Sequence, residues 1–183
     1  MNMNFLDLAN RRHSLRKYAA TPVPRAILDR CLEAARLAPS ACNSQPWHFI
    51  VADREPLRTQ LAAAAFSGLY SMNAFAKSAP VLIVAIRTSS RASAAIGGAV
   101  RGIQYGLIDV AIACEHIVLQ AAEDGVGSCW LGWFNEKAVR KLLGISRTNR
   151  VDTIISLGYP AEETGRPKIR RELDAIRTFN PEP

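Results

Sequence analysis

The sequence PSACNSQPW at Pro39–Trp47 separates a predicted helix from a predicted strand. Its prolines, serines and asparagine favour a polar loop, and Trp47–Ala52 (WHFIVA) then has the length and apolar content of a buried strand. Upstream, Thr21–Pro24 begins a helix, since proline is tolerated in a first turn, and this helix is expected to end near Ala38–Pro39. A helix, a polar loop and a buried strand therefore follow one another directly.

The rest of the chain mixes helices and strands without a strict strand-helix-strand alternation. Apolar spacing and turn residues predict three further helices: one from the turn at Asp53–Pro56 to about Phe66, a long one at Gln104–Glu123, and one capped by Asn135 and closed by Gly144. They also predict strands at Ala79–Ile86 and Asp152–Leu157, and a short strand or tight loop at Gly127–Phe134. The stretch Thr88–Gly102 has no firm periodicity and is expected to form a loop or lid. We predict one domain over residues 1–183, an α+β sandwich with helices around a mixed or antiparallel sheet.

Composition and charge limit the possible classes of protein. The longest clean apolar stretch, Ala79–Ile86, is far shorter than the roughly 20 residues of a membrane-spanning helix, and the amino terminus has no apolar signal core, so a cytoplasmic protein is expected. The four cysteines lie far apart and are expected to be reduced thiols, mostly in the core. The net charge of +7 comes from the two ends of the chain, whereas residues 61–135 are balanced. Such a distribution suits an anionic ligand held by both ends.

Common catalytic and nucleotide-binding signatures are missing from the sequence. The pair Gly125 and Gly127 lacks the third glycine of a dinucleotide fingerprint, and there is no Gly-Lys-Ser/Thr loop. A Gly-x-Ser-x-Gly elbow and a His-Glu-x-x-His helix are also absent. If the protein transfers electrons, a bound organic cofactor must carry them, and no metal site is expected.

Two clusters of polar residues could bind such a cofactor. Arg12, His13, Ser14 and Arg16 provide arginine forks and a hydroxyl that match phosphate oxygens, although a hydrated basic terminus would have the same sequence. In the loop before Trp47, side-chain amides offer donors and acceptors suited to the edge of a heterocycle. The alternative is that these amides bind only their own loop.

Taken together, Arg12-His13-Ser14-x-Arg16 and Ala38-Pro-Ser-x-x-Asn-x-Gln-Pro-Trp47 closely resemble the nitroreductase family, and the resemblance continues through Asp109–Gln120, Gly125–Phe134 and Gly158–Pro160. It implies an FMN-dependent α+β enzyme that works as an intertwined homodimer. It also implies ping-pong hydride transfer from NADH or NADPH, through the flavin N5, to small organic acceptors such as nitroaromatics or quinones. No catalytic side chain is expected.

The resemblance also implies roles for individual residues. The residues that match the family's contacts to the flavin phosphate and ribityl chain are Arg12, His13, Ser14 and Arg16, and the tail residues Lys168 and Arg170 would add contacts to the phosphate. Pro39, Ser40, Asn43 and Gln45 match the loop that a partner protomer places against the flavin. Trp130, Leu131 and Gly132 match the stretch beside the flavin ring. The tail, about residues 161–183, is expected to pack on the partner. Cys42 departs from the family pattern, and Asn73 matches a ring-contacting asparagine only weakly.

Three other functions remain open at this point. A dehalogenating or flavin-fragmenting enzyme of the same fold would share these residues. A non-catalytic flavin-binding protein would share them as well. A basic nucleic-acid-binding domain would account for the charge of +7 but not for Pro39–Trp47 or the charge-balanced middle. We expect neither a nucleic-acid nor a membrane partner.

Overall fold

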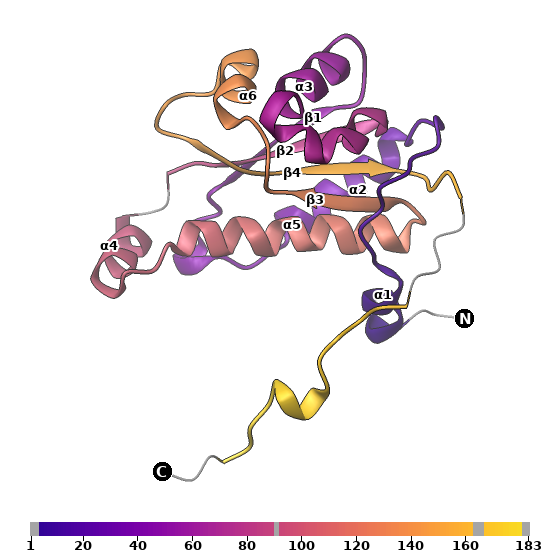
Figure 1. Cartoon of the computed structure of the whole chain (residues 1–183). Coiled ribbons are helices and arrows are strands. Elements are labelled where there is room, and N and C mark those ends of the chain that lie inside the picture. The colour runs from indigo at the N-terminus through magenta and orange to yellow at the C-terminus, as the bar shows by residue number, and fades with distance from the viewer. Residues whose placement is uncertain (1–3, 90–91, 163–166, 181–183) are drawn as a thin grey trace.

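The computed structural model describes residues 4–89, 92–162 and 167–180 (Figure 1). Its helices are α1 (Phe5–Arg11), α2 (Arg25–Arg36), α3 (Leu57–Ala65), α4 (Ala92–Arg101), α5 (Tyr105–Glu123) and α6 (Glu136–Leu143), with short 3-10 segments η1 (Ala41–Asn43), η2 (Gly68–Ser78) and η3 (Leu173–Ala175). Its strands are β1 (Trp47–Ala52), β2 (Val81–Arg87), β3 (Gly127–Leu131) and β4 (Arg150–Gly158). The strands form one sheet in the order β1-β2-β4-β3, and each adjacent pair is antiparallel.

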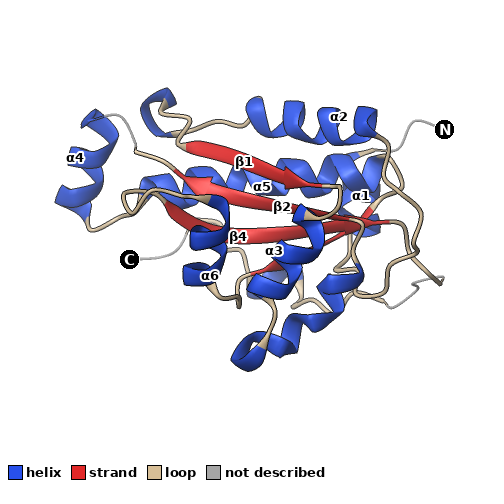
Figure 2. Cartoon of the chain, turned by 90° about the horizontal axis from the view of Figure 1, so that it is seen from above, coloured by secondary structure: helices blue, strands red, loops and turns tan. Residues whose placement is uncertain are grey.

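The sheet separates two hydrophobic cores. Alternate residues of β2 point to opposite faces, so Leu82 and Val84 join a core with α3 and α6, whereas Ile83 and Ala85 join a core with α2 and α5. Burial on both faces explains why the strand reads as an unbroken apolar run. Figure 2 shows the helices on the two sides of the sheet. The predicted α+β class, with a sheet flanked by helices, is confirmed.

Helix α5 forms the centre of one layer, packed against α2 and the sheet. By length and composition it is the one described helix that could cross a membrane, but half of its apolar window is buried inside the protein. Nδ1 of His116 lies 2.9 Å from the carbonyl oxygen of Ala34 and links α5 to α2. The helix therefore has the character of a core helix.

Most of the predicted elements agree with the structure. The strand at Trp47–Ala52 has the predicted bounds, and α2, α3 and α5 lie within about two residues of expectation. Asn135 caps α6 through its side-chain oxygen, which accepts from the N–H of Ala138 at 3.0 Å. Gly144 closes that helix with φ of +64°.

Cys31, Cys114 and Cys129 are buried thiols, as expected, whereas Cys42 is exposed.

Two helices were not predicted from the sequence. The expectation of a loop or lid at Thr88–Gly102 was wrong, because Ala92–Arg101 forms α4. Gly97 and Gly98 interrupt its apolar pattern, and glycine lowers helix propensity. Helix α1 was also not predicted, although the side-chain oxygen of Asn4 caps it by accepting a hydrogen bond from the N–H of Asp7.

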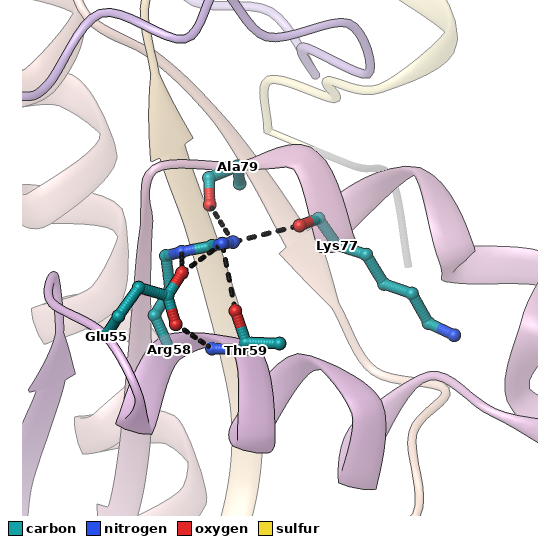
Figure 3. Close-up of polar contacts among 5 residues, drawn as sticks. All are labelled: Glu55, Arg58, Thr59, Lys77 and Ala79. Atoms are coloured by element: carbon teal, nitrogen blue, oxygen red, sulfur yellow. Dashed lines mark hydrogen bonds and ion pairs between the residues drawn. The ribbon is translucent and has the colours of Figure 1, made fainter.

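Arg58 connects α3 to the segment that leads into β2 (Figure 3). Its guanidinium donates to the carbonyl oxygens of Lys77 at 2.9 Å and Ala79 at 3.2 Å, and it pairs with Glu55 within the turn that begins α3. A second bond runs from the N–H of Thr59 to the Glu55 carboxylate. One side chain thus satisfies two carbonyl groups where η2 ends and the central strand begins.

The C-terminal segment leaves the body of the protein (Figure 1). Four apolar side chains along it, Ile169, Leu173, Ile176 and Phe179, are between 58% and 92% exposed. Four exposed apolar side chains within one short segment are unusual for a polar linker. Residues 163–166 and 181–183 of the predicted tail lie outside the described residues.

Candidate active site

The segment that follows α1 runs beside strand β3 and parallel to it. The N–H of Leu15 donates a 2.8 Å hydrogen bond to the carbonyl oxygen of Ser128, and Ser14 forms a parallel bridge with the same residue. This close approach requires Gly127, because a Cβ there would overlap the side chain of Leu15. Leu15 is buried, whereas Ser14 and Arg16 on either side of it are exposed. The packing of one leucine therefore presents two predicted ligand-binding side chains at the surface.

Arg12, Lys168 and Arg170 form a group that we call the cationic cluster. Nζ of Lys168 donates to the carbonyl oxygen of Ala9 in α1, and Nε of Arg12 lies 3.8 Å from Oε1 of Glu115 on α5. The pKa of Lys168 is lowered by burial and then by the positive charges of Arg12 and Arg170. Three cations close enough to repel one another, beside a single carboxylate, leave a surplus of positive charge that favours an anion.

A small pocket of 130 Å³ adjoins this cluster. It lies where the N-terminal segment meets the end of α5 and the start of β3, and its lining includes Arg11, Arg12, His13, Gly125 and Ser128. Nδ1 of His13 lies 3.1 Å from the carbonyl oxygen of Arg11. Whole small-molecule sites occupy about 300–1,000 Å³, so this recess has room for part of a ligand.

Arg16 lies over an aromatic ring at the edge of the sheet. Its guanidinium carbon is 5.9 Å from the centre of the Phe75 ring in η2, which is within the range of a cation–π contact. Burial raises the pKa of Cys129, while the charge of Arg16 and a hydrogen bond from Ser14 oppose that rise. Ser14 and Arg16 therefore both lie close to the β3 side chains.

The end of β3 combines a buried side chain with exposed backbone. Leu131 is buried and Gly132 is exposed, with open space where a Cβ would lie. Only the backbone of this stretch can therefore approach a ligand, together with the neighbouring Trp130, which is 37% exposed. Asn73 donates its side-chain N–H to the carbonyl oxygen of Trp133 at 2.9 Å, which fixes η2 against the end of the strand.

The predicted polar loop holds itself in an unusual conformation. Cys42, Asn43 and Gln45 have φ values of 50°, 50° and 47°, a region that L-residues other than asparagine and aspartate seldom adopt. Nε2 of Gln45 donates to Oδ1 of Asn43 at 2.8 Å, and the N–H of Gln45 donates to Oγ of Ser40 at 3.0 Å. Within one protomer the amides thus bind their own loop, as the alternative reading of this sequence anticipated. Pro39 is exposed at the start of the same loop.

Asp109 anchors this loop and was not identified from the sequence as a site residue. Its carboxylate is only 3% exposed, and Oδ1 accepts a 3.0 Å hydrogen bond from the N–H of Ala41. Oδ2 is buried without a hydrogen-bond partner among the described residues. The sequence feature that could have identified Asp109 is its position as the single acidic residue in the apolar run YGLIDVAIAC.

The cationic cluster and the polar loop lie at different positions along α5. The loop is attached at Asp109 near the start of the helix, whereas Arg12 lies beside Glu115 and the pocket that Arg12 lines reaches Ala122 near the end. Six and thirteen residues at about 1.5 Å each place Glu115 and Ala122 roughly 9 and 20 Å from Asp109 along the helix. The chain therefore brings Arg12, Lys168 and Arg170 together but attaches the loop of Asn43 and Gln45 at another point of α5.

The sequence and the fold were compared with those of known proteins. The model of the nitroreductase family matches residues 9–74 and 69–159. The chain is 37% identical over 182 residues to a protein of Archaeoglobus fulgidus whose provisional name is NADH dehydrogenase/NAD(P)H nitroreductase, an alignment that covers 97% of this chain and 94% of the relative. A protein of Methanothermobacter thermautotrophicus with the same provisional name is 32% identical over 167 residues, covering 89% and 81% of the two chains.

A solved structure has the same fold. The FMN-dependent nitroreductase from Clostridium difficile R20291 superposes with a TM-score of 0.73 at 31% identity, and the superposition covers 96% of this chain and 99% of the other. The agreement therefore extends over almost all of both chains.

Proposed function

The chain belongs to the nitroreductase family, and we propose that it is an FMN-dependent oxidoreductase that takes electrons from NADH or NADPH. The single observation that carries this proposal is the cationic cluster, in which Lys168 of the tail donates to the carbonyl oxygen of Ala9 in α1, the helix that Arg12 ends. Such a surplus of positive charge beside an exposed hydroxyl matches the phosphate of a mononucleotide.

The residues present fit FMN in the chemistry of their donors. Arg12, Lys168 and Arg170 would bind the phosphate, with His13 and Ser14 at the start of the ribityl chain. Arg16 and the exposed backbone at Gly132 would face the ring, where positive charge and N–H donors favour the additional negative charge of the reduced state. When bound, FMN supplies a centre at N5 that accepts and donates hydride.

We propose that a second copy of the chain completes each site. In its own chain the loop Pro39–Gln45 is attached at Asp109, roughly 9 Å along α5 from the Glu115 that Arg12 contacts and 20 Å from the Ala122 that lines the adjoining pocket, and its amides bind within the loop itself, so the loop of another protomer would contact the ring. The exposed apolar side chains of the tail would then pack on that protomer. The unit of function is a homodimer in which each chain, a single domain over residues 1–183, contributes to both sites.

The chain's own residues would bind and orient the reactants. No described side chain is assigned as a catalytic acid or base, and protons would come from solvent. The nicotinamide product would leave before the acceptor enters the same open face, which gives ping-pong kinetics with nitroaromatics or quinones as acceptors. We also propose that the enzyme acts in the cytoplasm, without nucleic-acid or membrane partners.

Anaerobic spectroscopy tests the proposed reaction. Purified protein saturated with FMN should show the visible flavin bands and lose them when NADH or NADPH is added without air, and they should return when p-benzoquinone is added. Protein that binds no FMN contradicts the proposal outright. Flavin that stays oxidised with both nucleotides would instead support a non-catalytic flavin-binding protein.

Two other functions have weaker support. A dehalogenating or flavin-fragmenting activity is less favoured, because the relatives at 32% and 37% identity have nitroreductase and NADH dehydrogenase names. Binding to a nucleic-acid backbone should weaken steeply as salt rises. Retention of bound FMN through a titration to 0.5 M NaCl, without DNA binding at low salt, would exclude that function.

A further inference from the structure

A second polar pocket, of 410 Å³, lies where the ends of β2 and β4 meet α4 and the start of α5. Side chains and backbone from all these elements line it, including Arg87, Thr88, Gln104, Gly106, Thr148 and Arg150. Two of its lining residues are arginines, and none of the described lining residues is acidic. Its size is within the range of small-molecule sites.

The two arginines lie directly opposite each other in the sheet. Arg87 of β2 pairs with Arg150 of β4 in the strand register, and like charges in such positions are unfavourable. Asp152 pairs directly with Arg87, through a 3.1 Å hydrogen bond from Nη2, whereas no hydrogen bond or ion pair joins the Arg150 side chain to a described residue. The charge of Arg150 opposes the rise that burial causes in the pKa of Asp152, so both arginines act on the same carboxylate. Two guanidinium groups therefore share one carboxylate, and a net positive charge remains at the pocket.

The position of Arg87 is fixed by a second contact. Its Nη1 donates to Oε1 of Gln104 at 3.0 Å, so this side chain is held in place at the pocket wall. Gln104 stands at the N-cap position of α5, and its side chain makes no capping bond there. The arginine is thus oriented without any ligand.

The backbone adds donors to the same pocket. The N–H groups of Tyr105 and Gly106 begin the 19-residue helix α5 and have no hydrogen-bond partner among the described residues. On the other side, α4 packs closely through Gly98 against the turn that joins it to α5, because a Cβ at Gly98 would lie 2.6 Å from the carbonyl oxygen of Ile103. The glycine therefore helps to form a close wall beside these free N–H groups.

We propose that this pocket binds the oxyanion group of a small organic anion, a phosphate or a carboxylate. The fork of Arg150 and the remaining N–H groups of Arg87 would contact the oxygens, together with the first N–H groups of α5 and the hydroxyls of Thr88 and Thr148. The site is separate from the cationic cluster, since Gly106 lies roughly 14 Å along α5 from the Glu115 that Arg12 contacts. It does not depend on the proposed flavin chemistry.

Calorimetric titration at constant ionic strength tests this site. Inorganic pyrophosphate and citrate serve as the phosphate and carboxylate probes, and each is titrated into the protein both with and without saturating FMN. When FMN occupies the cationic cluster, we expect saturable binding of at least one probe to one site per chain, and at least tenfold weaker binding at this site in Arg150→Gln. Without FMN the phosphate probe is expected to fill the cationic cluster as well. The tighter probe identifies the class of anion.

A variant with the same loss of charge serves as the matched control. Arg147→Gln removes an exposed arginine three residues away that does not line the pocket. With FMN present it should bind the probe as the unsubstituted protein does. The proposal is overturned if neither probe binds saturably, if Arg150→Gln binds normally, or if Arg147→Gln weakens binding as much as Arg150→Gln. Arg150 is exposed, and matching circular dichroism spectra will verify that its variant is folded.

Discussion

The N–H of Ala41 donates a 3.0 Å hydrogen bond to the buried carboxylate of Asp109. This contact attaches the loop to the first turns of α5, next to three residues with positive φ. Backbone of this kind costs on the order of 1 kcal/mol per residue that is not glycine, so the loop needs an external attachment. The geometry that the loop would offer to the proposed second protomer therefore depends on Asp109, a residue inside the core.

Replacement of Asp109 should loosen the loop. Asp109→Ala leaves the Ala41 N–H without its acceptor, and we expect a free energy of unfolding lower by about 1.5–3 kcal/mol. Asp109→Asn keeps an acceptor oxygen and should recover part of this loss. Urea denaturation measures both effects. Asp29→Ala, an exposed aspartate on α2, is the control, and equal stability of the two alanine variants would refute the anchoring role.

Arg58 should contribute measurably to stability because it satisfies two carbonyl groups at once (Figure 3). Arg58→Ala should lower the free energy of unfolding by about 1–3 kcal/mol. Arg54→Ala, at an exposed arginine of the same turn, should change it by less than about 0.5 kcal/mol. Thermal and urea unfolding provide the comparison, and a loss of similar size in both variants would contradict the interpretation.

The cationic cluster should recognise the phosphate of FMN and not its ring. Lys168→Met should raise the Kd for FMN by about 10–100-fold, the range expected for a charge-assisted hydrogen bond. The Kd for riboflavin, which lacks the phosphate, should stay the same. Fluorescence titration with both flavins measures the difference. Arg171→Met, at an exposed tail arginine, is the control, and a parallel loss of riboflavin affinity in Lys168→Met would assign the lysine another role.

Alkaline pH should destabilise the protein through its buried thiols. Burial raises the pKa of Cys31 and of Cys114 from 9.0 to about 12. Above pH 9 the unfolded chain therefore loses these protons while the folded chain keeps them, so the free energy of unfolding falls as pH rises towards 12. Each thiol contributes a slope of up to about 1.4 kcal/mol per pH unit.

Denaturation under reducing conditions between pH 8 and 10.5 measures that slope. Burial also raises the pKa of Tyr18, which acts in the same direction at the upper end of this range. Cys114→Ala should show a shallower slope than the unsubstituted protein. An unchanged slope would mean that this thiol does not contribute.

The sequence predicted most of the fold because the strands and long helices have clear apolar patterns. Trp47–Ala52 was delimited correctly from its turn residues and apolar run alone. Helix α4 was missed because paired glycines interrupt its periodicity. Helix α1 was missed because it buries no side chain, so only its Asn4 cap marked it.

The candidate site was predictable as a set of residues but not as an arrangement. The meeting of Arg12 with Lys168 depends on how the tail returns to α1, which no local pattern encodes. Asp109 was undervalued because its partner Ala41 is 68 positions away. The separation of the loop from the cationic cluster depends on where each is attached along α5, at Asp109 and beside Glu115, and these contacts became known only from the structure.

A mixed dimer tests most directly whether FMN binds between two chains. One chain carries Arg12→Gln and Lys168→Gln, the other carries Asn43→Ala and Gln45→Ala, and different affinity tags allow the mixed species to be isolated. Each parent should bind FMN weakly at both of its sites. The mixed dimer should regain one tight FMN site, because it pairs one intact cationic cluster with one intact loop. A mixed dimer that binds FMN no better than its parents, or a protein that stays monomeric, would contradict a site shared between protomers.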